Sequence, residues 1–414
     1  MFAGLFSSTK NKTKTILLVD VGSGSVGAGL GRLNSKGKPI LLYSKREALP
    51  VSFTRSGKEL QSGVLKAAKV AIEDVRKVSA LWSEGTAIVP QKIEHIAFFL
   101  AAPWSTIALK SVHFSRSKPF KMSTSVLERM LTEENKISAE IASAMPLEIE
   151  KTAVSLWLNE YRAESLSDSL VTSVDVTLAT TNSFLGIHDE LQALARSFPG
   201  SPAITFHSFG LPASHALLTL KPDIRDALLL DVGSEVTEIL QIKNGSLVSR
   251  ATAPVGSSLY VRTLRTHANM SGAEADSALK LAQNDGTRLS QELAVPLTDV
   301  GKIWLKGLSQ ALIPLADNGL PIEIYVLADA RVQSWIQSSI ELNGMPDVYR
   351  NVVPKVTRLD EKEFRAGVDV KAEAGDAFLM AELLFSDSRL DAGSSISLLS
   401  TREPLLLRRH DTIE

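Results

Sequence analysis

The residues most capable of chemistry lie in a glycine-rich stretch near the N-terminus, "ILLVDVGSGSVGAGLG", residues 16–31. An apolar run ends in Asp20, and Gly22, Gly24 and Gly27 follow with the spacing G-x-G-x-x-G. Glycine lets a backbone approach a ligand closely, and consecutive N–H groups in such a turn can bind phosphate oxygens. The same spacing is typical of enzymes that bind NAD in a strand–turn–helix unit. The stretch therefore predicts a phosphate-binding loop.

The residues after this loop do not have the pattern of a helix. Val26, Ala28 and Leu30 alternate with other residues, which predicts a second strand. A turn at 34–38 and an apolar run at 39–44 predict a third strand, and no crossover helix fits between them. We therefore expect an antiparallel meander, and the NAD-binding interpretation is disfavoured because it requires a helix directly after the loop.

A similar stretch occurs again near the middle of the chain, in "ALLLDVGSEVTEILQIKNGSLVSR" (227–250). It contains an apolar run, then Asp231, Gly233 and Ser234, and an Asn-Gly turn at 244–245 that predicts a hairpin. The residues Asp-Val-Gly-Ser stand at the same position in both hairpins. We expect the two hairpins to hold a triphosphate between them, with the two aspartates binding Mg2+ through water.

Composition excludes several classes of function. The chain has 414 residues, 44% apolar and 22% charged, which suits two or more domains with a large core. Lys and Arg total 45 against 46 Asp and Glu, so we expect no nucleic-acid partner. Cysteine is absent, which rules out disulfides and cysteine-based metal sites and fits a reducing compartment. No apolar run is long enough to span a bilayer.

The paired hairpins and the order of the elements around them resemble the actin-like ATPase superfamily. "DVGSGS" (20–25) is similar to its first phosphate loop and "DVGSEVT" (231–237) to its second. "FGLPASHALL" (209–218) and "APVGSSLYVRTLRTHANMSGAEADSALKL" (253–281) resemble segments of the group that contains the cell-division protein FtsA and the type IV pilus assembly protein PilM. The resemblance implies an α/β actin-like two-lobed fold, with duplicated ribonuclease H-like sheets and an inserted α+β subdomain.

The resemblance also implies a division of the chain into lobes and tails. The expected parts are a flexible tail at 1–13, a first actin-like lobe at 14–103 and 201–226, an inserted subdomain at 104–200, a second lobe at 227–387 and a C-terminal tail at 388–414. Within the insertion, the residue patterns predict strands at 107–114, 152–165 and 169–181 and helices at 123–135 and 183–198.

On the same resemblance, the cofactor-binding residues come from four short segments. They are Asp20, Gly22, Ser23, Gly24, Ser25, Asp231, Gly233, Ser234, Thr237, Gly256, Ala328 and Asp329, and Asp20 and Asp231 are also the expected metal ligands. The chain departs from the family pattern where Ser234 and Glu235 replace two glycines of the second loop and where Ala328 and Asp329 replace the Gly-Gly of the adenosine motif. A carboxylate beside phosphate repels it, so ATP and Mg2+ are expected to bind weakly or not at all. ATPase activity is expected to be weak or absent, and no catalytic residue is identified.

The resemblance implies a scaffold or adaptor, cytoplasmic and near the inner face of the cell membrane, that a protein of a membrane-associated bacterial machine recruits. Type IV pilus assembly is the expected setting, and the resemblance leaves open self-association into filaments and peripheral membrane contact. One alternative is an FtsA-like cell-division protein that polymerises and binds a tubulin-like partner. A second alternative is an actin-fold phosphotransferase such as a sugar kinase, although no motif supplies its catalytic carboxylate.

Overall fold

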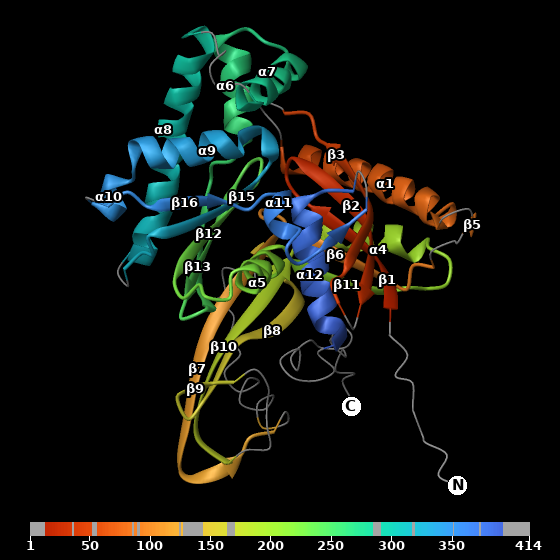
Figure 1. Cartoon of the computed structure of the whole chain (residues 1–414), viewed down its shortest axis with the longest axis vertical. Coiled ribbons are helices and arrows are strands. Elements are labelled where there is room, and N and C mark those ends of the chain that lie inside the picture. The colour runs from red at the N-terminus through yellow and green to blue at the C-terminus, as the bar shows by residue number, and fades with distance from the viewer. Residues whose placement is uncertain are drawn as a thin grey trace, which may run out of the picture.

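The structure is a computed structural model that describes residues 13–34, 37–51, 56–84, 87–88, 92–123, 126, 144–163, 170–284, 291–316, 319–350, 352–371 and 374–391. Figure 1 shows two lobes, each built around a sheet with helices packed on it, and a long further sheet that extends away from both. The expected α/β class and the expected pair of lobes are therefore both present.

The first lobe contains a mixed six-stranded sheet. Its strands in spatial order are β11 (Ala203–Ser208), β6 (His95–Leu100), β1 (Thr13–Val21), β2 (Ser25–Asn34), β3 (Ile40–Ala48) and β17 (Asp369–Val370). Strands β1, β2 and β3 form the expected antiparallel meander, and β6 pairs parallel to β1. Because a strand and not a helix follows the first loop, the strand–turn–helix unit of an NAD-binding enzyme is absent at that loop.

Both faces of the first sheet are covered, which explains why β1 is a continuous apolar run. One face packs against α1 (Gly57–Ala80) and α4 (Leu185–Arg196). The other face packs against α5 (Gly210–Leu220) and α12 (Ala377–Asp391).

The second lobe repeats this arrangement in a five-stranded sheet. Its order is β14 (Ser246–Ala253), β13 (Thr237–Lys243), β12 (Ala227–Val232), β15 (Glu323–Ala328) and β16 (Lys355–Arg358). Strand β12 pairs antiparallel with β13 and parallel with β15, just as β1 pairs with β2 and β6. The lobe's helices are α6 (Ser258–His267), α7 (Gly272–Asn284), α8 (Gln291–Ala316), α9 (Ala330–Asn343), α10 (Pro346–Tyr349) and α11 (Glu361–Phe364). The expected duplication of the sheets is thus confirmed.

The inserted region forms a four-stranded antiparallel sheet. Its order is β7 (Ser105–Lys121), β10 (Leu170–Ser183), β8 (Leu147–Leu158) and β9 (Tyr161–Arg162). A separate two-stranded pair, β4 (Ser83–Glu84) and β5 (Ala87–Ile88), follows α1. The helix expected at 123–135 lies outside the described residues except for Ser123 and Val126. Within the described ranges, no helix is long and apolar enough to cross a bilayer.

Two helices pack in a different part of the molecule from the one that the resemblance assigns to them. Helix α4, which that division gave to the insertion, packs through Ile187, Leu191 and Ala195 into the core of the first lobe. Helix α12, which it gave to the second lobe, packs on β2 of the first sheet, where the absence of side chains at Gly29 and Gly31 makes room for Leu379 and Leu383. Strand β2 is about 350 positions before α12, so spacing along the chain could not reveal that contact.

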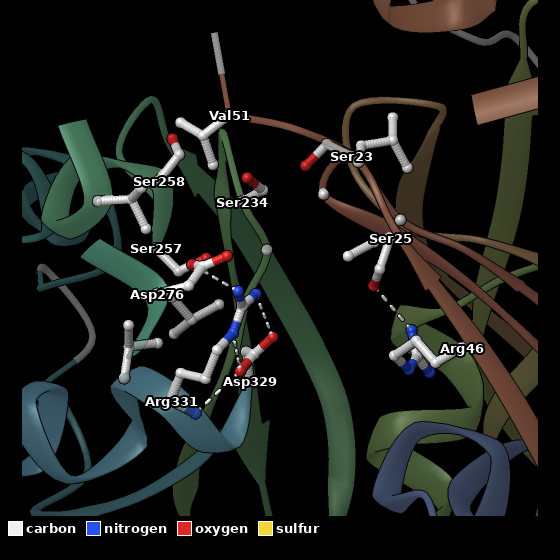
Figure 2. A pocket seen from close by; sticks show the side chains of 18 of the residues that line it. Ser23, Ser25, Arg46, Val51, Ser234, Ser257, Ser258, Asp276, Asp329 and Arg331 are labelled. Atoms are coloured by element: carbon white, nitrogen blue, oxygen red, sulfur yellow. Dashed lines mark hydrogen bonds and ion pairs between the residues drawn. The ribbon is translucent and has the colours of Figure 1, made fainter. Parts of the chain in front are cut away.

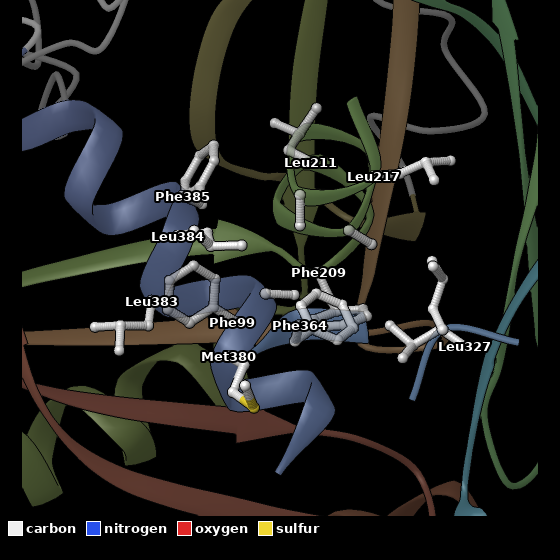
Figure 3. Close-up of a cluster of buried hydrophobic side chains, with 14 of the residues drawn as sticks. Phe99, Phe209, Leu211, Leu217, Leu327, Phe364, Met380, Leu383, Leu384 and Phe385 are labelled. Atoms are coloured by element: carbon white, nitrogen blue, oxygen red, sulfur yellow. The ribbon is translucent and has the colours of Figure 1, made fainter. Parts of the chain in front are cut away.

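One apolar cluster joins the two lobes below the hairpin loops, and Figure 3 shows its centre around α12 and α5. It contains Phe99 from the first sheet, Leu327 from the second sheet and Phe209 from the segment between the lobes. All three side chains are buried. The lobes therefore share a continuous core, which fixes how the two hairpin loops meet.

Candidate functional site

A cavity of about 470 Å³ lies between the lobes, where the β1–β2 and β12–β13 loops approach each other (Figure 2). Nine of the twelve expected cofactor-binding residues line it: Asp20, Gly22, Ser23, Gly24, Ser25, Asp231, Gly233, Ser234 and Asp329. Thr237, Gly256 and Ala328 do not line it. The two copies of the Asp-Val-Gly-Ser pattern thus meet at one cleft, as the paired hairpins predict.

The two hairpin loops touch each other directly. The first loop is tight, with the Gly22 N–H donating to the Ser25 carbonyl at 3.1 Å. A Cβ at Gly24 would lie 2.4 Å from the Ser234 Cβ, so only glycine allows this approach. The Glu235 N–H donates to Ser23 Oγ at 3.2 Å and closes the contact. The tips of the two loops are therefore in direct contact.

The second loop is tied to the start of α6. The N–H groups of Ser257 and Ser258 donate to the carbonyls of Gly233 and Ser234, each at 2.9 Å. A Cβ at Gly256 would lie 2.3 Å from the Ser234 carbonyl oxygen, so this glycine serves the close approach. These two backbone donors at the helix start are used within the protein and do not point to an anion.

Thr237 and Ala328 support the second loop from below without reaching the cavity. Thr237 is fully buried, and its hydroxyl donates to the Val255 carbonyl at 2.7 Å. Ala328 is the last residue of β15 and is 5% exposed. Both residues therefore fix the backbone around the second loop.

Asp20 and Asp231 are both buried in the cleft but have different partners. Asp20 Oδ2 lies 2.8 Å from Arg46 Nη1. Burial raises the pKa of Asp20 to about 6, although Arg46 acts in the opposite direction. Burial, reinforced by the charges of Glu238 and Asp20, raises the pKa of Asp231 well above its usual value.

An arginine occupies the side of the cavity where the sequence analysis placed the adenosine motif. Arg331 donates to Asp329 through Nε and Nη2, at 2.8 and 2.7 Å, and to Asp276 through Nη1 at 2.7 Å (Figure 2). Asp329 also caps α9 by accepting from the Arg331 N–H. Although burial acts to raise it, the hydrogen bonds and charge of Arg331 hold the pKa of Asp329 below its usual value. Asp329 is thus paired with Arg331.

Glu235 does not point into the cavity. Both of its carboxylate oxygens accept from Arg262 Nη2, at 2.8 and 2.7 Å, and neither residue lines the cleft. The expectation that its charge faces a phosphate group therefore differs from the structure. The reason is that Glu235 forms an ion pair with Arg262, which lies one turn into α6.

The charged side chains that line the cleft balance one another. Its lining carries the cations Arg46, Arg265 and Arg331 against four aspartates, so no surplus positive charge faces a triphosphate. Arg46 and Arg331 are each held by two carboxylates. Among the described residues there is also no group of three or more His, Asp or Glu placed to hold a metal ion. A bound triphosphate would compete with these carboxylates for Arg46 and Arg331.

Sequence reasoning missed the residues that neutralise the site. Arg46 comes from β3, Asp276 from α7, Arg331 from α9 and Asp376 from the segment before α12. They come from four separate parts of the chain, and isolated charged residues of these types are usually exposed to solvent. The only local signal is Asp329 two positions before Arg331 at a helix start, a pattern that also occurs in ordinary caps.

No family model and no curated protein sequence matches this chain. Solved structures do resemble it. A chain of the PilM–PilN type IV pilus biogenesis complex superposes with a TM-score of 0.55 at 12% sequence identity, over 90% of this chain and 96% of that chain. The ethanolamine utilization protein EutJ from Carboxydothermus hydrogenoformans gives a TM-score of 0.42 at 12% identity, over 90% of each chain.

The duplicated sheets, the two hairpin loops facing one cleft and the first of these similarities define the class of protein. The chain has an actin-like ATPase fold. Within that fold, its architecture is similar to that of the chain in the PilM–PilN complex.

Proposed function

We propose that this protein is an actin-fold scaffold or adaptor of a membrane-associated assembly, most like the type IV pilus assembly protein PilM, with a degenerate nucleotide site. The observation that carries the proposal is the direct contact between the hairpin loops, where Gly24 meets Ser234 and the Glu235 N–H meets Ser23 Oγ. A cleft closed by the chain's own groups needs no ATP to hold the lobes together. Such a protein presents one lasting surface to a partner.

The similarity to a chain of the PilM–PilN complex supports a partner of the same kind. We propose that a protein of a membrane-associated bacterial machine recruits this chain in the cytoplasm, at the inner face of the cell membrane. The partner supplies the attachment in this proposal. Self-association into filaments and direct peripheral contact with the membrane are additional hypotheses.

Calorimetric titration tests the nucleotide part of the proposal. We expect no saturable heat on adding ATP with Mg2+ to the full chain and no rise in its melting temperature, because the cations of the cleft are already paired. ADP and Mg2+ alone serve as controls. Saturable binding of ATP with Mg2+ at micromolar concentration would contradict a degenerate site.

Proximity labelling in the native cell tests the scaffold part. A labelling enzyme fused to the full chain should mark subunits of one assembly that contains membrane-spanning proteins. The same enzyme expressed alone gives the background. A labelled set of soluble metabolic enzymes, with no membrane-spanning protein enriched, would oppose the scaffold function.

A further inference from the structure

The guanidinium of Arg46 has a full set of partners at the base of the cleft. Its Nη1 lies 2.8 Å from Asp20 Oδ2 and 2.9 Å from Ser25 Oγ. Its Nε and Nη2 donate to the two oxygens of Asp376 at 2.7 and 3.0 Å. The ring of Phe378 lies against the group, with its centroid 5.0 Å from the guanidinium carbon. Asp20, Ser25, Asp376 and Phe378 therefore form a cation-binding environment around Arg46, which we call the receptor.

The third glycine of the opening pattern belongs to this receptor. A Cβ at Gly27 would lie 2.6 Å from Arg46 Nη2, so any other residue would displace the guanidinium. Gly27 pairs with Arg46 across β2 and β3, which brings the guanidinium close to the end of β1. The spacing G-x-G-x-x-G therefore has a structural explanation here that involves no dinucleotide.

The backbone around the two carboxylates that bind Arg46 holds them in place. Asp376 Oδ1 accepts from the N–H groups of Phe378 and Leu379 at 3.1 and 3.2 Å, so the start of α12 orients it. Asp20 is the next-to-last residue of β1 and is 3% exposed. Rigid, buried oxygen ligands of this kind are also what a partly hydrated divalent cation requires.

The charge balance of the receptor would also suit a divalent cation. Two carboxylates, Asp20 and Asp376, share the single positive charge of Arg46. One guanidinium thus leaves an excess negative charge that a doubly charged ion would cancel.

We propose that Arg46 is the resident cation of this cleft and occupies a site whose oxygen ligands, from Asp20, Asp376 and Ser25, would otherwise bind a hydrated divalent cation. The inference rests on the proposed degenerate nucleotide site and names the group that replaces its metal. A guanidinium cannot dissociate from the chain, and its planar fork fits a carboxylate with two parallel hydrogen bonds. The first loop is therefore held in place whatever the concentration of Mg2+ in the cell.

Removing the guanidinium should convert the receptor into a metal site. We expect Arg46→Ala to bind Mn2+ at least about tenfold more tightly than the wild type, measured by calorimetry and by the spin resonance of free Mn2+, with Mg2+ competing. Mn2+ should also raise the melting temperature of Arg46→Ala and leave that of the wild type unchanged. In the double variant Arg46→Ala with Asp20→Asn, the gained Mn2+ binding should disappear.

Arg76→Ala is the matched control, because Arg76 pairs with one carboxylate, Glu73, on the exposed face of α1. It should gain no Mn2+ binding. Failure of folded Arg46→Ala to gain Mn2+ binding would overturn the inference. Wild-type protein that binds Mn2+ and loses this binding in Asp20→Asn would overturn it as well.

Arg46→Ala is also informative if it does not fold by itself. Refolding in millimolar Mn2+ or methylguanidinium should then restore a cooperative thermal transition, whereas neither ion restoring it would refute the receptor. The outcome is separate from that of the ATP titration. Tight ATP binding by the wild type contradicts the proposed function, while an Arg46→Ala variant indifferent to Mn2+ contradicts only this inference.

Discussion

The backbone N–H of Glu235 donates a hydrogen bond to Ser23 Oγ at 3.2 Å, across 212 positions of sequence and between the two lobes. Ser23 is 1% exposed, so water does not compete for this contact. The bond joins the two copies of Asp-Val-Gly-Ser at the place where the sequence analysis expects a triphosphate. The contact of Gly24 with Ser234 joins the same two loops.

Replacing Gly24 with valine should push the loops apart. The new side chain would start 2.4 Å from the Ser234 Cβ, and the resulting overpacking should lower the free energy of unfolding by about 1–3 kcal/mol. Urea unfolding measures the loss, and small-angle scattering should show a larger radius of gyration. Gly57→Ala is the control, because nothing lies within 4 Å of its Cβ position. Equal stability of both variants would show that the loops do not rely on this contact.

Replacing Glu235 should have little effect on ATP. Its carboxylate is paired with Arg262 and does not line the cavity, so Glu235→Gly removes no charge that faces a phosphate. We expect calorimetry to show no saturable ATP binding by the variant, as for the wild type. Because the pair is 27% exposed on both sides, its loss should cost about 0–1 kcal/mol. ATP binding at micromolar concentration in Glu235→Gly would restore the idea that this carboxylate repels the nucleotide.

The hairpin loops could be predicted from the sequence because their signal is local. Asp20, Gly22, Asp231 and Gly233 stand in a short, repeated pattern, in which an apolar run precedes the loop and an alternating strand follows it. Arg46 and its ligand Asp376 could not be predicted, because they meet only after α12 returns to the first sheet, 330 positions away. A pair at that distance leaves no periodic trace in one sequence. The position of the cleft could therefore be predicted from the sequence. The ion pairs of Arg46 with Asp20 and Asp376 could not.

His95 of β6 should lower the stability of the protein on acidification. Burial, and then the positive charges of His207 and Lys14, lowers the pKa of His95 to about 4. The unfolded chain takes up this proton near pH 6.5 and the folded protein only near pH 4. The contribution is complete above the unfolded pKa and is lost as the pH falls toward about 4, by up to about 3 kcal/mol.

His95→Gln tests this sign, because it removes the titrating group and keeps a hydrogen-bond partner for Thr205 Oγ1. The loss of unfolding free energy between about pH 7 and about pH 5 should be smaller in the variant than in the wild type. His267→Gln, at an exposed position, should follow the wild type. Asp20 acts with the opposite sign, since its raised pKa favours the folded state at low pH, but it is present in all three proteins. Parallel pH profiles for wild type and His95→Gln would contradict the argument.

A buried polar junction fastens the inserted sheet to the first lobe. Glu150 Oε1 of β8 accepts from His207 Nδ1 of β11 at 2.9 Å and lies 3.0 Å from Arg389 Nη2 of α12. Arg389 also stacks on Phe385, with its guanidinium carbon 4.1 Å from the ring centroid. Although burial acts to raise it, the charges of His207 and Arg389 hold the pKa of Glu150 below its usual value. One carboxylate thus connects the insertion, the sheet and the last described helix.

Glu150→Gln should loosen all three elements together. Removing the charge leaves Arg389, whose side chain is 21% exposed, beside a neutral amide, and the loss should cost about 1–3 kcal/mol. Hydrogen exchange should show reduced protection in both β8 and α12, because each loses the same partner. Glu148→Gln, an exposed change in the same strand, should alter neither stability nor exchange. If Glu150→Gln loses protection in β8 while α12 stays protected, the carboxylate does not couple the insertion to the C-terminal helix.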